Sequence, residues 1–168
     1  MPKILLVIAP EGFRDEEYFD TKAVLEAAGV ETETASKTPG EKQGMLGGKA
    51  KAELGLGDVK PEDYDGIVWV GGVGAQVYFD DERALELAKS FYQAGKLVAA
   101  ICIAPVILAN AGLLKGRKAT CWNGKFREML LQAGADFQEQ DVVRDGKLVT
   151  ANGPHAAKSF AEEILKAL

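Results

Sequence analysis

Apolar runs and amphipathic segments alternate along most of the 168-residue chain. Residues 3–9, 65–70 and 98–101 are almost wholly apolar, as expected of strands that are covered on both faces of a parallel sheet. Residues 30–35 read VETETA, and the alternation of valine and threonine with glutamate predicts a strand nearer the sheet edge, with one face in water. These four segments predict the core of a largely parallel sheet.

Segments with helical spacing separate the predicted strands. In each of them apolar residues recur every three or four positions, and several end at a glycine, which is common just after a helix. Strands and helices that alternate in this way are typical of α/β proteins. We predict a doubly wound, mainly parallel sheet with helices on both faces. The predicted helices span residues 15–28, 81–94, 103–112, 125–133 and 156–168.

Two further regions are expected to form ribbons and hairpins. Residues 36–60 are rich in glycine and lysine, which suits short ribbons, turns and a loop better than a helix. Such an excursion is either an interaction surface or a solvated flap. Residues 118–121 read as a short strand, and residues 137–144 and 147–150 flank Asp145-Gly146, a signal for a tight hairpin.

A cysteine stands where one predicted strand runs directly into a helix. Cys102 follows the VAAI strand, and Pro105 lies in the first helical turn, where a backbone N–H is not needed. A join without loop residues forces a sharp turn, as in a nucleophile elbow, and places the thiol near the positive end of a helix, where its pKa is lowered. Cys102 is therefore either a reactive thiol or a small buried apolar residue.

Three glycines follow the predicted strand at residues 65–70, in the sequence Gly71-Gly72-Val73-Gly74. The spacing is not GxGxxG and the next helix begins only near Asp81, so a dinucleotide cofactor is not indicated. Glycines here permit close backbone approach, and they could turn N–H groups toward a negative charge that develops beside Cys102. We expect no cofactor.

Composition indicates one ordinary globular domain over residues 1–168, with 47% hydrophobic and 27% charged residues. The net charge of -5 and the lack of a basic cluster do not favour nucleic acid as a partner. The apolar run near the N-terminus is too short for a membrane span and lacks a cleavage site, so we expect a cytoplasmic protein without membrane partners. Two cysteines do not make a disulfide framework, and one histidine excludes a His-rich metal site.

Four motifs, in their order along the chain, resemble the ThiJ/PfpI (DJ-one) superfamily, which is related to the class I glutamine amidotransferases. They are the early FRDEEYFD, the GG after the Trp69 strand, VAAICIAPVILANAGLLKGRKAT around the elbow, and the late TANGP. The resemblance covers nearly the whole chain and implies a flavodoxin-like fold with a cysteine elbow. It also implies a homo-oligomer, a dimer or larger, with Tyr18, Phe19 and residues 36–60 as the expected contact regions.

The resemblance implies roles for residues around the elbow thiol. In the family a glutamate on the first helix hydrogen-bonds the cysteine, and by spacing from Phe13 the matching residue is Glu17, with the adjacent Glu16 as the alternative. A carboxyl with a raised pKa can donate to a thiolate, whereas two charged groups would repel. Without the resemblance, Glu17 would be an ordinary first-turn acid. The implied oxyanion hole is formed by the N–H groups of Gly72 and Ile103.

The sequence departs from the family at its familiar histidines. Protease-like members carry a histidine directly after the cysteine, where this chain has Ile103, and other members carry one at the position of Trp122. The single histidine, His155, follows a late strand on the same rim of the sheet as Cys102. It is either a base that approaches the thiol by another route or a surface residue at a helix start. Cys121 either lines the same pocket or is a packed structural cysteine.

Three functions are consistent with these residues. In a glyoxalase III or deglycase-like enzyme, Cys102 adds to a small aldehyde such as methylglyoxal, and Glu17 or His155 moves the proton. In an intracellular cysteine peptidase or amidase, His155 acts as the base and the substrate is a peptide or amide. In a redox-sensing or protective stress protein without catalysis, Cys102 is oxidised and Glu17 stabilises the product. We favour the first of these functions.

Overall fold

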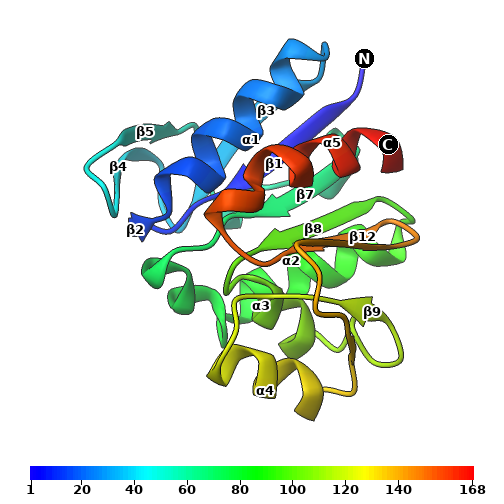
Figure 1. Cartoon of the computed structure of the whole chain (residues 1–168). Helices are drawn as coiled ribbons and strands as arrows, with labels where there is room; N and C mark the ends of the chain where they lie inside the picture. Colours follow the sequence, from blue (N-terminus) through cyan, green and yellow to red (C-terminus); the bar gives the residue numbers. More distant parts are fainter.

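A seven-stranded sheet forms the centre of the molecule in the computed structural model, which describes residues 1–168 (Figure 1). The strand order is β11-β12-β8-β7-β1-β3-β6, and every neighbouring pair is parallel except β11 with β12. The predicted mainly parallel sheet is therefore confirmed. The strands are β1 Lys3–Val7, β3 Glu31–Ser36, β6 Leu54–Gly55, β7 Gly66–Trp69, β8 Leu97–Ile101, β11 Val142–Asp145 and β12 Leu148–Ala151.

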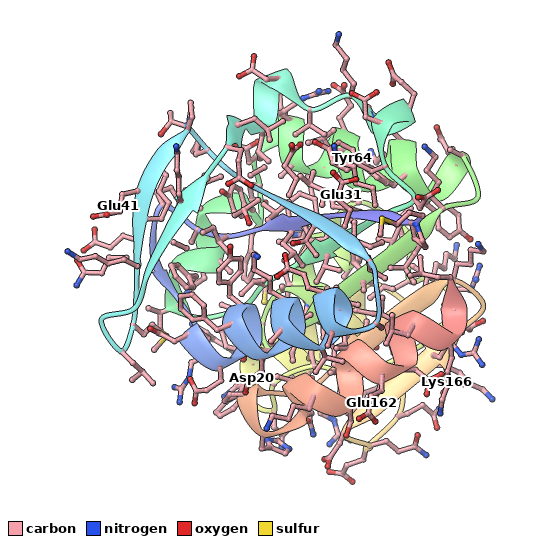
Figure 2. The ribbon with its side chains drawn as sticks, turned by 90° about the horizontal axis from the view of Figure 1, so that it is seen from above. Asp20, Glu31, Glu41, Tyr64, Glu162 and Lys166 are labelled. Carbon is pink, nitrogen blue, oxygen red and sulfur yellow. The ribbon has the colours of Figure 1, made fainter.

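Helices cover both faces of this sheet, as predicted. On one face α1 (Asp15–Ala27) packs along α5 (Ala157–Ala167), and Figure 2 shows the two helices side by side with the labelled Asp20, Glu162 and Lys166 on them. The other face is covered by α2 (Glu82–Gln93) and α3 (Pro105–Asn110), and α4 (Lys125–Gln132) packs against α3 (Figure 1). Short 3-10 helices span η1 Leu56–Asp58, η2 Pro61–Asp63, η3 Val73–Tyr78 and η4 Pro154–Ala156.

The central strands are buried on both sides, which explains their uninterrupted apolar sequences. All five residues of β8 and all four of β7 are buried, and one hydrophobic cluster of 53 buried residues joins the sheet to its helices. Helix α2 keeps its polar residues outside and begins where the Asp81 side chain accepts a hydrogen bond from Ala84 N (2.9 Å). The carboxyl ends of β7 and β8 are therefore held rigidly side by side.

Two smaller sheets lie outside the central one. The Gly-rich excursion supplies β4 (Gly40–Gly44) and β5 (Lys49–Ala52), an antiparallel ribbon as predicted, and β4 pairs with β2 (Glu11–Phe13). The ribbon turn is fastened to α1, because the Asp15 carboxylate accepts hydrogen bonds from the backbone N–H groups of Leu46 (2.8 Å) and Gly48 (2.7 Å). The two-stranded sheet pairs β9 (Lys118–Ala119) with β10 (Asp136–Phe137).

Three predicted boundaries were wrong. The strand expected over residues 137–144 is interrupted, because the backbone turns between Phe137 and Val142. The strand expected over residues 118–121 ends at Ala119 and lies outside the central sheet. The helix expected over residues 103–112 begins only at Pro105, because a tight turn occupies the residues after β8.

One of the residues expected to contact a second copy of the chain is buried. Tyr18 is 3% exposed, and its hydroxyl lies 2.7 Å from Thr34 Oγ1 within the chain. Phe19 beside it is 39% exposed, and Leu46 in the excursion over residues 36–60 is 63% exposed, so Phe19 and that excursion stay the predicted contact regions. No helix has both the length and the apolar character needed to cross a bilayer.

Candidate active site

Cys102 lies at the carboxyl end of β8 in a strained backbone conformation. Its φ of 66° makes it the one residue other than glycine with a positive φ, a conformation that costs on the order of 1–3 kcal/mol for such a residue. Its N–H donates to Ala151 O (2.9 Å), and its carbonyl accepts from Trp122 N (2.7 Å). The neighbouring strand and loop therefore hold the elbow in place, and the thiol is 7% exposed.

Glu17 projects from the first turn of α1 into the protein beside this thiol. It is fully buried, Oε1 accepts a hydrogen bond from Gly71 N (3.0 Å), and Oε2 has no nitrogen or oxygen partner. Burial raises the pKa of Glu17 to about 8, although its interactions with Cys102 and Gly71 oppose that rise. The carboxyl is therefore largely protonated at neutral pH.

Gly71 makes the approach of carboxyl and thiol possible. A Cβ added to this residue would lie 2.6 Å from each of Cys102 Cβ, Glu17 Oε1 and Ile101 O. No ordinary side chain fits at that distance, so the absence of a side chain at Gly71 is what lets α1 place its carboxyl against the elbow.

Two backbone amides reach the Cys102 sulfur, and they belong to the predicted pair, Gly72 and Ile103. Both N–H groups interact with the thiol and act to lower its pKa, and neither donates to a backbone carbonyl. Gly72 has a φ of 101°, which favours glycine, and an added Cβ would lie 2.4 Å from Arg14 N. These amides can stabilise a negative charge on sulfur or on an atom bound to it.

Burial nevertheless dominates the acidity of the thiol. Desolvation and the charge of Glu17 raise the pKa of Cys102 above that of a free cysteine, and the two amides offset only part of the rise. The expectation that the strand-helix join lowers this pKa is therefore wrong for the resting protein. Because the charge of Glu17 opposes ionisation of the thiol, the two groups titrate as a coupled pair.

The thiol opens onto a pocket of about 190 Å³. Its walls are mainly apolar, and Arg14 supplies the one permanent charge among them. The lining residues are Arg14, Met45, Gly72, Val73, Gln76, Cys102, Ile103, Trp122, Phe126 and Pro154. This volume suits a small organic molecule.

The structure does not bring His155 to the thiol. Its ring is exposed, Nε2 lies 3.4 Å from Asp141 Oδ1, and it makes no hydrogen bond to Cys102. His155 lines a neighbouring pocket of about 360 Å³ together with Cys121, and Trp122 stands between the two pockets because it lines both. A cysteine-histidine pair is therefore absent from this arrangement.

Cys121 behaves as a packed cysteine. It is 2% exposed, its Sγ donates to Trp122 O (3.3 Å), and burial raises its pKa. Both cysteines are free thiols. No three His, Cys, Asp or Glu side chains come together as a metal-binding group.

Two features of the site were missed by sequence reasoning. Arg14 lines the thiol pocket, and Gly71, rather than Gly72 alone, controls how closely the carboxyl approaches. The signal for Gly71 was present in the double glycine after β7, and that for Arg14 in the FRDEE motif, where it directly precedes the acidic first turn of α1.

The fold and this site define the class: a flavodoxin-like α/β protein with a cysteine at a nucleophile elbow and a buried carboxyl beside it. A sequence model described as the DJ-1/PfpI family matches residues 2–167, so the chain belongs to the DJ-1/PfpI family. In structure, it is similar to a ThiJ/PfpI domain protein from Brachyspira murdochii, with a TM-score of 0.96, 37% identity, and coverage of 98% of this chain and 95% of that one.

Curated relatives extend this similarity along the whole chain. The uncharacterised protein MJ0967 of Methanocaldococcus jannaschii is 46% identical over 99% of this chain and 82% of its own length. Deglycase PfpI of Pyrococcus furiosus is 35% identical over 99% of both chains. YraA of Bacillus subtilis, described provisionally as a cysteine protease, is 32% identical over 100% of this chain and 99% of its own.

Proposed function

We propose that this protein is a cofactor-independent enzyme that converts small reactive carbonyl compounds through the thiol of Cys102, in the manner of a glyoxalase III or a deglycase. The observation that carries the proposal is a buried thiol beside a buried carboxyl whose pKa is raised, at a pocket of about 190 Å³ that no histidine lines. The similarity to a protein named deglycase PfpI supports it.

In the proposed reaction of methylglyoxal, the Cys102 sulfur adds to the aldehyde carbon. A C–S bond forms, the C=O electron pair moves to the oxygen, and the thiol proton ends on that oxygen, which gives a hemithioacetal. The hydrogen on the former aldehyde carbon then leaves as a proton and returns to the neighbouring carbon, while the hydroxyl proton moves to the oxygen of that neighbouring carbon, which gives a lactate thioester. Water hydrolyses the thioester, releases lactate and restores the thiol, so the net reaction adds one water to methylglyoxal.

Glu17 has the acidity that the proton transfer requires. A group that first accepts and then donates a proton works best when its pKa lies near the operating pH. With a pKa of about 8, Glu17 populates both forms near neutrality. The amides of Gly72 and Ile103 would stabilise the oxygen that becomes negative as the sulfur adds.

The other two functions draw less support. A peptidase needs a base for the leaving amine, and the one histidine instead pairs with Asp141 at 3.4 Å. Oxidation is fastest for exposed thiolates, whereas Cys102 is 7% exposed and burial raises its pKa.

The proposal is tested by lactate formation from methylglyoxal in the presence of a metal chelator. We expect turnover by the wild type and by Cys121→Ser, a matched control at the second buried cysteine, and a loss of at least about a hundredfold in Cys102→Ser. Lactate formation that survives in Cys102→Ser, or a wild type that forms none, would contradict the proposal.

A further inference from the structure

The thiol pocket holds a charge that the proposed reaction does not use. Ten residues line the pocket, and Arg14 is the one with a permanent charge. Addition of a thiol to a neutral aldehyde is served by Cys102, the Glu17 carboxyl and two backbone amides. The charge of Arg14 acts to lower the pKa of Glu17, but the guanidinium donates no hydrogen bond in the conversion of a neutral substrate.

Arg14 is fixed in position before any ligand arrives. Its Nε donates to Glu16 Oε1 (2.9 Å), its Nη2 donates to Glu16 Oε2 (3.0 Å), and its backbone N–H donates to Gly71 O (2.9 Å). A two-point ion pair of this kind restricts the long side chain, so binding a ligand would cost little further conformational entropy.

One end of the guanidinium is left without a partner. Nη1 makes no hydrogen bond to the protein, and the side chain is 30% exposed at the pocket that it lines. Nη1 carries two N–H donors, and a carboxylate is the acceptor that a guanidinium binds most strongly. The pocket walls include the apolar side chains of Met45, Ile103 and Phe126, and no carboxylate is among the lining residues.

We propose that Arg14 is a specificity residue that selects carbonyl compounds carrying a carboxylate close to the reacting carbonyl. The guanidinium binds the carboxylate while the carbonyl carbon meets the Cys102 sulfur. The catalytic part of this inference rests on the proposed carbonyl chemistry, whereas the recognition of a carboxylate beside the thiol can be measured without any turnover.

The test compares two alkylating reagents that differ in one group. Iodoacetate and iodoacetamide both form a C–S bond with the thiolate and release iodide, but iodoacetate carries a carboxylate. The ratio of their rate constants at Cys102 cancels the fraction of thiolate, so it does not respond to any effect of Arg14 on the acidity of the thiol. Peptide mass spectrometry separates Cys102 from Cys121.

We expect the iodoacetate-to-iodoacetamide ratio to fall on the order of tenfold in Arg14→Gln, as for loss of a charge-assisted hydrogen bond. Arg14→Lys should give an intermediate ratio, because lysine keeps the positive charge but lacks the paired N–H donors of the guanidinium. This variant also provides a test if Arg14→Gln does not fold. Arg127→Gln, at an arginine outside the pocket lining, should leave the ratio unchanged.

A second probe uses a carbonyl compound. Glyoxylate, an aldehyde with a carboxylate, should protect Cys102 from iodoacetamide at a lower concentration in the wild type than in Arg14→Gln, and glyoxal should protect both proteins equally. An unchanged reagent ratio in Arg14→Gln, or equal loss of rate with both reagents, would overturn the role of Arg14. If the wild type forms no lactate but the reagent ratio still falls in Arg14→Gln, the proposed function is refuted and the recognition of a carboxylate by Arg14 stands.

Discussion

Replacing Glu17 by glutamine should make the protein more resistant to unfolding as the pH rises. Glutamine has nearly the same shape, and its Oε1 can still accept the Gly71 hydrogen bond that Glu17 receives at 3.0 Å. It differs in that it cannot ionise. The substitution therefore isolates the free energy of placing a carboxylate in the fully buried site beside Cys102.

The magnitude follows from the pKa of Glu17 in the two states. The pKa is about 8 in the folded protein against 4.5 for a freely exposed glutamate, so between these values the folded state holds a proton that the unfolded chain has lost. Stability of the wild type should therefore fall as the pH rises through this window and level off above it. From about pH 5.5 to about pH 8 the ionisation of Glu17 lowers the free energy of unfolding by about 3 kcal/mol.

The assay is urea unfolding of the wild type and Glu17→Gln at both pH values, with the free energy taken by linear extrapolation. The difference between the two proteins should grow by about 3 kcal/mol over this range, because groups away from the site titrate alike in both proteins and cancel. Burial raises the pKa of the coupled Cys102 thiol well above this range, so the thiol adds little to the difference. Glu16→Gln is the matched control: the Arg14 ion pair lowers the pKa of Glu16, so its contribution does not vary above about pH 5.5. A difference for Glu17→Gln that is independent of pH would refute the reasoning.

Two further substitutions probe the geometry of the site. Gly71→Ala should destabilise the protein by about 1–3 kcal/mol and displace Glu17, since the added Cβ would lie 2.6 Å from three atoms. The control is Gly57→Ala, where nothing lies within 4 Å of the added Cβ, and it should leave thermal unfolding nearly unchanged. His155→Ala should change the rate of lactate formation less than about twofold, because His155 pairs with Asp141 rather than the thiol, and a loss of more than about tenfold would place the histidine in the reaction after all.

The sheet could be predicted because its strands are buried on both faces. Almost wholly apolar segments such as β1 and β8 are stable only when both faces are buried, so their apolar composition alone predicts where these strands lie. The weakest predictions fell where tertiary contacts decide the backbone. The late start of α3 depends on the positive φ of Cys102, and the break between β10 and β11 occurs in a mostly polar segment with no strong pattern of its own.

The elbow was likewise visible in the sequence, but its surroundings were only partly so. A strand that runs straight into a helix identifies Cys102 as the elbow residue. The local sequence does not tell which of the adjacent Glu16 and Glu17 reaches the thiol, because that depends on the face of α1 that each occupies: Glu17 is buried and Glu16 pairs with Arg14. The position of His155 depends on Asp141, a contact between residues 14 apart that no periodicity reveals.

The most direct measurement of the coupling between Cys102 and Glu17 is the rate of Cys102 alkylation by iodoacetamide against pH, in the wild type and in Glu17→Gln. The charge of Glu17 raises the pKa of the thiol, so the variant should reach half of its maximal rate at a lower pH than the wild type, while its lactate formation falls because the proton carrier is gone. The same midpoint in both proteins, with full activity in the variant, would show that the thiol works without the carboxyl.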